Sequence, residues 1–256
     1  ELVVVDNGSA DGTCEWLRTE LSAQADAAGV PLKTVFHSEN VGCSTARNTG
    51  AEQADGHQLV FVDNDVALRS RHWLEQLGTF LDNNPQAAMV GPKLVYPYEP
   101  YNIQCAGAAV APTGRVQFRG RGEPRDHPEY NDTREVQCLI SACFMLQRSA
   151  FNEAGGFDEA FNPVEYEDID LCYRIRSAGH LLYYLPHVEM YHLESMTTEG
   201  TPALPNTYLI VKHGMTFKQR WRHMFEHENG PTDQQAKWRP TGARCSDRIG
   251  RLPIID

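Results

Sequence analysis

Apolar residues along the chain fall into short continuous runs, and segments with helical spacing separate these runs. The first run covers residues 1–5 and another covers residues 59–62, and residues 32–36 also have a strand pattern. Between them we expect helices at 11–28 and 43–53. Continuous apolar runs are typical of strands that are buried on both faces of a sheet. The first part of the chain therefore predicts an α/β fold with a parallel sheet built from β-α-β units.

The alternation of strands and helices continues to Pro92 and then stops. A helix at 72–83 and a strand at 88–91 precede this point, whereas Gly-, Pro- and Arg-rich connections with short strands follow at 96–136. Further along we expect a strand at 139–147, a short helix at 149–154, a helix from the acidic residues 165–170 to about 178, and strands at 181–185 and 188–191. We therefore divide the chain into two halves of one domain, 1–95 and 96–225, and a polar C-terminal tail, 226–256.

Composition excludes several classes of function. The 256 residues carry a formal net charge of −11, which opposes binding to nucleic acid. No stretch reaches the roughly 18 to 20 continuous apolar residues of a membrane-spanning helix, and the N-terminus has no signal-peptide pattern. The seven cysteines are scattered and show no C-x-x-C pair. We interpret them as reduced thiols and expect a cytoplasmic protein.

An acidic triplet, Asp63, Asn64 and Asp65, directly follows the predicted strand at 59–62. In an extended chain, residues two apart project to the same side, about 6 to 7 Å along the strand. Both carboxylates are then expected to address one divalent cation, which could hold a diphosphate. The alternative is a pair of acids in a surface turn. The position at a strand end favours the cation site, because open parallel sheets place ligand groups there.

A second acidic group opens the predicted helix in the second half. Glu165, Glu167, Asp168 and Asp170 lie within six residues, and burying them together is costly unless a cation or hydrogen-bond donors compensate. One of them can serve as a general base near the metal. The alternative is an ordinary acidic first turn, which the positive end of a helix stabilises.

Three further residues each have a functional and a plain structural interpretation. His192 ends a predicted strand and can bind a metal through one imidazole nitrogen, or it can be a satisfied structural histidine. Asp6 can form an Asx turn before Gly8. Arg47 can be a solvated helix residue. None of the three is decisive when taken alone.

Taken together, these residues resemble the family-two glycosyltransferases of the GT-A fold, from residue 1 to about Trp221. The matching segments are VDNGSADGT at 5–13, NVG at 40–42 with ARNTG at 46–50, FVDND at 61–65, GGFDE at 155–159, YEDIDL at 166–171 with Arg174, and Tyr191 with His192. Segments 91–94 and 103–107 look more like the rhamnosyltransferase-like branch. The resemblance implies a Rossmann-like open mixed sheet flanked by helices, and metal-assisted transfer of a sugar with inversion.

The resemblance also implies a role for each position. Asp168 matches the family's catalytic base, and Asp65 is the direct ligand of a Mn²⁺ or Mg²⁺ ion, supported by Asp63 and His192. Residues 1–95 form the nucleotide-sugar-binding half and residues 96–225 the acceptor and catalytic half. The residues implied in binding the donor are Asp6, Asn7, Arg47, Asp63 and Asn64.

The expected partners are a UDP- or dTDP-linked sugar and a carbohydrate, lipid-linked or protein acceptor. Peripheral contact with the inner face of a membrane is compatible with this class of acceptor. In one respect the chain departs from the family, because a strand and a helix that precede the first strand in the family have no counterpart before residue 1. We therefore expect a sheet that lacks them and exposes strand edges.

Two other functions remain open from the sequence. A nucleotidyltransferase also holds metal and phosphates with acidic pairs, but it would show a Gly-rich phosphate loop after its first strand. A non-catalytic nucleotide-sugar-binding module could retain the same fold, because fold does not fix function. The presence of Asp63, Asp65 and Asp168 favours an enzyme.

Overall fold

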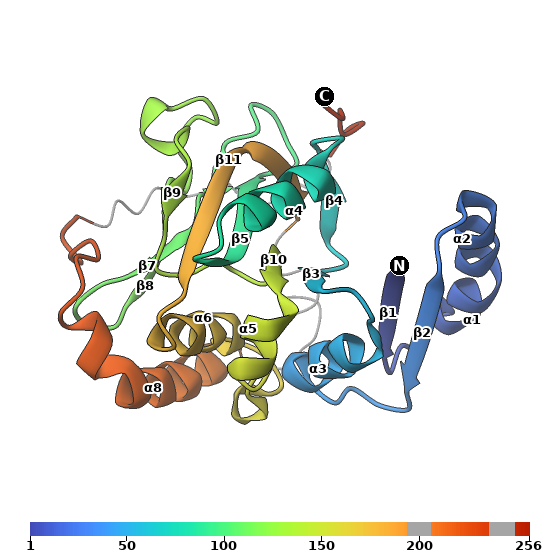
Figure 1. The fold of residues 1–256 in the computed structure, drawn as a ribbon, viewed down its shortest axis with the longest axis horizontal. Helices are drawn as coiled ribbons and strands as arrows, with labels where there is room; N and C mark the ends of the chain where they lie inside the picture. Colours follow the sequence, from blue (N-terminus) through green and yellow to red (C-terminus); the bar gives the residue numbers. More distant parts are fainter. Residues whose placement is uncertain (194–205, 236–248) are drawn as a thin grey trace.

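A mixed seven-stranded β-sheet forms the centre of the molecule (Figure 1). The computed structural model describes residues 1–193, 206–235 and 249–256. The strands lie in the order β3-β10-β5-β11-β4, with β6 beside β5 and β9 beside β11. Only β5 and β11 are parallel among these described pairs. The strand bounds are β3 Gln58–Val62, β4 Val66–Leu68, β5 Ala87–Val95, β6 Ile103–Cys105, β9 Arg134–Glu135, β10 Cys143–Gln147 and β11 Leu181–His192.

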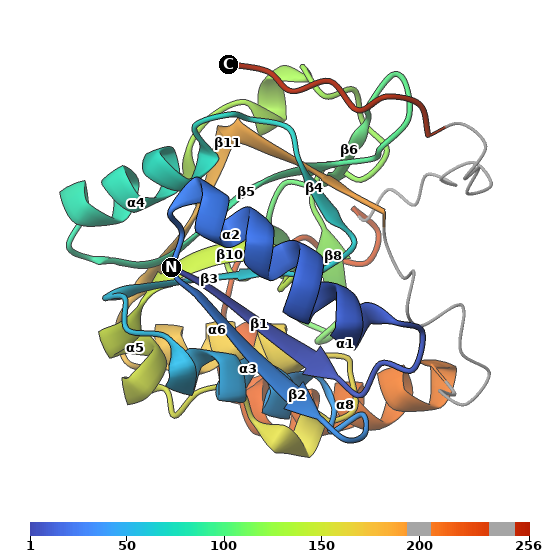
Figure 2. The same cartoon turned by 90° about the vertical axis from the view of Figure 1, so that its right-hand side faces the viewer.

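A separate two-stranded parallel sheet is formed by β1 (Leu2–Asn7) and β2 (Leu32–His37). The connection between them is one continuous helical segment, α1 (Thr13–Trp16), a π-helical turn (Leu17–Leu21) and α2 (Ser22–Ala28). Figure 2 shows this helix in front of the two strands. The first predicted β-α-β unit is therefore confirmed. Among the described residues, however, β1 pairs only with β2, so the expectation that residues 59–62 extend the same parallel sheet is wrong.

Helices cover both faces of the central sheet. On one face, α4 (Trp73–Asn83) buries Leu77 and Leu81 against Val90 and Val188. The spacing of four residues between the two leucines places them on one side of the helix. The other face carries a larger core beneath α5 (Arg148–Glu153), α6 (Glu167–Ser177) and α8 (Asn206–Phe225). A further helix, α3 (Cys43–Gln53), packs on β1 and leads into β3.

Short elements complete the second half. A hairpin of β7 (Ala108–Val110) and β8 (Val116–Phe118) adjoins the core, and 3-10 turns occur at Pro128–Tyr130 and Glu159–Phe161. The described parts of the tail contact the domain at several points, including a hydrogen bond from Thr113 to Asp233 and an ion pair of Arg71 with Asp256. Tyr173 donates a hydrogen bond to Glu228, and Ile255 forms a bridge with Ser70. No described helix has the length and apolar character needed to cross a membrane.

Several elements differ from the sequence prediction. The strand expected at 139–147 begins at Cys143, and the two strands expected at 181–185 and 188–191 are one irregular strand, β11. The short strand β4 was not predicted. Neither was α8, although Leu209, Phe217, Trp221 and Phe225 are buried on one side of it with multiples of four between them.

Candidate active site

A cavity of about 580 Å³ opens between the end of β3, the residues before β10 and the start of α6. Both halves of the domain contribute to its walls. Of the residues predicted from the sequence, all except Asp6 line it. These are Asn7, Arg47, Asp63, Asn64, Asp65, Asp168 and His192. The structure therefore brings together side chains that are up to 185 positions apart in the chain.

Arg47 connects the two acidic motifs across this cavity. Its guanidinium lies 2.7 Å from a carboxylate oxygen of Asp63 and 2.7 Å from one of Glu167. Burial would lower the pKa of Arg47, but the two carboxylates outweigh it and raise the pKa well above its usual range. Glu167 is 3% exposed, and its second oxygen has no hydrogen-bond partner among the described residues. Arg47 is thus a half-buried ion-pair partner, and its interpretation as a solvated helix residue is wrong.

Helix α3 holds the second half of the domain at two further points. Asn48 donates to the backbone oxygen of Phe157 at 2.9 Å and accepts from its backbone nitrogen at 2.8 Å. The backbone nitrogen of Ser44 donates to Asn162 at 3.1 Å. These contacts fix the segment that leads into α6, so the position of Asp168 depends on residues of the first half.

The acidic triplet lies in a turn and not in an extended chain. The backbone nitrogen of Val66 donates to the backbone oxygen of Asp63 at 3.1 Å, which closes the turn between β3 and β4. The expectation that both carboxylates project from an extended strand is therefore wrong. Asp63 is paired with Arg47, whereas Asp65 lies beside His192. In an extended strand the side chains of Asp63 and Asp65 would project to the same side, and the tight turn separates them.

The two ring nitrogens of His192 have different neighbours, and Nε2 is the one that faces Asp65. The Nε2 atom of His192 is 3.4 Å from Oδ1 of Asp65, and the Nδ1 atom is 2.6 Å from Oε1 of Gln104. The amide nitrogen of Gln104 donates to the backbone oxygen of His192, so Oε1 must act as acceptor and Nδ1 carries a proton. In the neutral ring, Nε2 then presents a lone pair toward a carboxylate. A cation between these two acceptors removes the mismatch.

Gln104 was not among the predicted site residues. It is fully buried on β6 and reaches His192 through both ends of its amide. A glutamine in a short strand gives no sequence signal of its own. Only the pairing of β6 with β5, and of β5 with β11, brings Gln104 to the histidine.

Asp168 is half-buried at the start of α6 and lines the cavity. One carboxylate oxygen accepts from the backbone nitrogen of Ser141 at 3.0 Å, and the other accepts from Ile169 at 2.7 Å. Burial, with the nearby charge of Glu167, raises the pKa of Asp168 to about 7. A carboxylate with this pKa can exchange a proton near neutral pH.

The other acids of the cluster have different surroundings. Asp170 is fully buried and accepts from Arg174, Arg220 and the Trp221 indole at 2.8 Å each, so it is a structural anchor for α8. Glu165 lines the cavity, and burial, followed by the charge of Glu167, raises its pKa to about 7. Its φ angle of 84° lies in the left-handed region, which a side chain other than glycine rarely adopts.

Asp6 shows the local turn expected from its position before Gly8. It is 4% exposed, and its carboxylate accepts from the backbone nitrogen of Ser9 at 3.0 Å and from the thiol of Cys14 at 3.2 Å. Burial would raise the pKa of Asp6, but these hydrogen bonds outweigh it and lower the pKa. Its neighbour Asn7 reaches the cavity instead and accepts from Val41.

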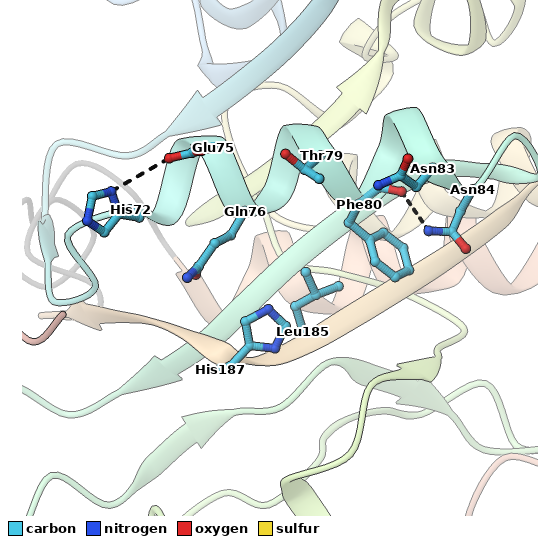
Figure 3. A pocket seen from close by; sticks show the side chains of 9 residues that line it. All are labelled: His72, Glu75, Gln76, Thr79, Phe80, Asn83, Asn84, Leu185 and His187. Carbon is cyan, nitrogen blue, oxygen red and sulfur yellow. Dashed lines mark hydrogen bonds and ion pairs between the residues drawn. The ribbon is translucent and has the colours of Figure 1, made fainter.

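A second cavity, of about 630 Å³, lies between α4 and β11 (Figure 3). It is lined by Gln76, Phe80 and Leu185, with His72 paired to Glu75 at its edge. None of the residues predicted for catalysis, donor binding or metal binding lines it.

Comparison with known proteins gives a consistent assignment. The model of glycosyl transferase family 2 matches residues 1–155, which is more than half of the chain. The chain belongs to glycosyl transferase family 2. The predicted recognition is thus confirmed, and the mixed sheet flanked by helices is the GT-A architecture of this family. The matched residues include the turn at Asp6 and the acidic triplet.

Two relatives extend the similarity beyond the matched residues. An N-acetylglucosaminyl-diphospho-decaprenol L-rhamnosyltransferase of Mycobacterium tuberculosis is 37% identical over 84% of this chain and 73% of its own length. The protein y4gI of Sinorhizobium fredii is 29% identical over 87% of this chain, and the chain spans only 24% of its length. The solved structure of GalNAc-T7 with UDP, GalNAc and Mn²⁺ superposes with a TM-score of 0.68 at 18% identity, over 88% of this chain and 43% of that one.

Proposed function

We propose that this member of glycosyl transferase family 2 transfers a sugar from a nucleotide-diphosphate-sugar donor to an acceptor hydroxyl, with inversion at the anomeric carbon. One observation carries the proposal. The proton-accepting Asp168 and the pair of Asp65 and His192 line the same cavity. A base for the acceptor and ligands for a phosphate-bound cation are the two groups that a single displacement requires.

Asp65 and His192 fit a divalent ion, Mn²⁺ or Mg²⁺. A carboxylate and an imidazole lone pair face each other, and the described residues provide no cluster of three or more ligands. Such an ion keeps several positions for waters and substrate phosphates, so two protein ligands suffice. When bound, the ion would offset the negative charge that develops on the departing nucleoside diphosphate. The Mn²⁺ in the superposed GalNAc-T7 structure supports this choice of ion.

Asp168 provides the base of the reaction. The acceptor hydroxyl loses its proton to the Asp168 carboxylate while its oxygen attacks the anomeric carbon from the face opposite the nucleotide. The bond from that carbon to the diphosphate oxygen breaks in the same step, so the configuration inverts. Ser141 and Ile169 donate to the two carboxylate oxygens and hold the base in place.

The two halves of the domain divide the substrates. We assign donor binding to residues 1–95, with Asn7, Arg47 and Asn64 at the cavity, and acceptor binding to residues 96–225. Asp63 supports the donor site through Arg47. The donor is proposed to be a UDP- or dTDP-linked sugar, and the acceptor a lipid-linked or other glycan, as the name of the mycobacterial relative suggests.

A panel of nucleotide sugars tests the proposal. With Mn²⁺ present, one of them should raise the melting temperature and be slowly hydrolysed, because a ligand that binds only the folded state stabilises it. Chelation with EDTA should remove both effects, and Asp65→Ala should do the same. Binding without any turnover, unchanged in Asp168→Asn, would favour the non-catalytic binding module. Equal affinity in EDTA and in Mn²⁺ would contradict the metal role.

A further inference from the structure

Helix α8 carries an apolar stripe on its outer side. Tyr208, Val211 and Met215 are 62%, 56% and 67% exposed, although all three are large apolar residues. Their spacing of three and four residues places them on one side of the helix. The opposite side buries Phe217 and Trp221 against the core. Figure 1 shows α8 along the lower edge of the molecule, outside α6.

The charge on α8 is opposite to the charge of the chain. Between Asn206 and Phe225 the helix contains four basic residues and no Asp or Glu, whereas the chain has a net charge of −11. The basic residues are Lys212, Lys218, Arg220 and Arg222. Helical geometry puts Lys212 and Arg222 within roughly 60° of the stripe, on either side of Met215. Arg222 also pairs with Glu226, just after the helix, at 3.5 Å. Arg220 belongs instead to the core side, where it pairs with Asp158.

The N-terminal part of α8 also borders the catalytic cavity. Ile210 lines this cavity, and His213 donates to the backbone oxygens of Val164 and Glu165 just before α6. A helix with its side chains is about 10 Å across. The stripe and the cavity wall are therefore separated by little more than the width of one helix.

We propose that α8 docks on an anionic lipid bilayer, with Tyr208, Val211 and Met215 inserted at the boundary between headgroups and acyl chains. An apolar stripe flanked by cations matches such a surface, and the acidic remainder of the chain disfavours any other orientation. The docked helix holds the cavity near the bilayer, where a lipid-linked acceptor presents its sugar. This last step rests on the proposed function, whereas the docking does not.

Vesicle sedimentation of the whole chain tests the docking. Wild-type protein should bind vesicles of phosphatidylcholine with about a third phosphatidylglycerol, and should bind pure phosphatidylcholine more weakly. Val211→Ser with Met215→Ser should weaken binding by about tenfold or more. Lys212→Glu should weaken only the binding to anionic vesicles, and added salt should have the same effect. Leu74→Ser is the matched control, because Leu74 is 49% exposed on α4.

Several outcomes would overturn the docking. They are the absence of binding to anionic vesicles, an unchanged affinity in the double serine variant, or an equal loss in Leu74→Ser. A dimer that the double variant abolishes would assign the stripe to a second copy of the chain. Melting temperatures of the variants check that each is folded, which is expected because the changed side chains are exposed.

The acceptor step has its own measurement. Transfer to a glycoside with a long alkyl chain should rise when anionic vesicles are added to wild-type protein, and should not rise in the double serine variant. Hydrolysis of the nucleotide sugar without vesicles should be equal in both proteins. If both proteins fail to hydrolyse any donor, the proposed function fails while the vesicle binding can still hold. If hydrolysis is present and vesicles do not stimulate transfer in wild-type protein, the acceptor step is wrong.

Discussion

Replacing Asp168 by asparagine removes the proposed base while keeping nearly the same shape. Turnover should fall by about 10² to 10⁴-fold, because the proton moves only in the transition state. Donor affinity should change little, since the carboxylate is assigned to the acceptor. The same variant also has a measurable effect on folding. An acid whose folded pKa is raised destabilises the folded state once the unfolded chain has ionised.

The size of the folding effect follows from the pKa of about 7. Below about pH 3 the group is protonated in both states, so it has no effect on stability. At about pH 5 the ionised unfolded state gains about 1.5 kcal/mol over the folded state, and at about pH 8 the value reaches about 4 kcal/mol. Asp168 is partly exposed, so solvent screening reduces these values, by about half as an order of magnitude. The gain in stability of Asp168→Asn should therefore grow by about 1 to 2.5 kcal/mol between these two pH values.

Urea unfolding of wild type and variant at the two pH values measures this growth. Lost hydrogen bonds to Ser141 or Ile169 lower the stability of the variant equally at both pH values, so they cancel in the difference. Asp55→Asn is the control, because the Asp55 side chain is 87% exposed. The change in its stability between the two pH values shows how much an Asp-to-Asn replacement at the surface contributes. A stability difference that stays constant or shrinks with rising pH would refute the raised pKa. If the turnover of Asp168→Asn stays within a few-fold of wild type, Asp168 is not the base. Glu165 is then the next carboxylate to replace.

Three further changes test other parts of the site. Asp170→Asn should lower the free energy of unfolding by about 3 to 5 kcal/mol, because Arg174 loses its carboxylate partner and Arg220 keeps only Asp158. A loss below about 1 kcal/mol in urea would contradict the anchoring role. Gln104→Met should weaken Mn²⁺ binding by about 10- to 100-fold in calorimetry with a nucleoside diphosphate, whereas equal affinity would mean that Gln104 does not orient His192. Arg47→Met should lower the melting temperature, because it leaves the buried carboxylate of Glu167 without its cation. An unchanged melting temperature would count against this ion pair.

Local patterns were sufficient for much of the fold. The segments 1–5 and 32–36 became β1 and β2, and the helix between them formed as expected, because strand and helix patterns are properties of neighbouring residues. The expected burial of these strands on both faces is wrong, since β1 and β2 are mostly half-buried. The strand β4 has only three residues, too few to show a periodicity. The sequence did not predict helix α8, although its buried residues Phe217 and Trp221 are four positions apart. The helix also carries apolar residues on its exposed side, so the helical spacing of the buried ones does not stand out.

The sequence singled out residues that line one cavity, but it did not reveal their geometry. The sequence identified Asp63, Asp65 and His192, yet the turn at Val66 separates the two carboxylates and gives them different partners. Such a turn depends on one backbone hydrogen bond, which the pattern of acids does not reveal. The role of Asp170 likewise depends on Arg220, a residue 50 positions away on α8. Roles that depend on contacts between distant elements required the structure.

The contacts of α3 limit how this enzyme can be recombined with its relatives. Arg47 and Asn48 hold residues of the second half, so a crossover near residue 95 would join a foreign α3 to the native segment that bears Asp168. Where the relative's helix lacks the arginine or the asparagine, such a chimera would leave Glu167 without its cation or Phe157 without its amide partner. Donor specificity is therefore better exchanged as a mosaic, in which α3 and residues 155–170 are inherited together.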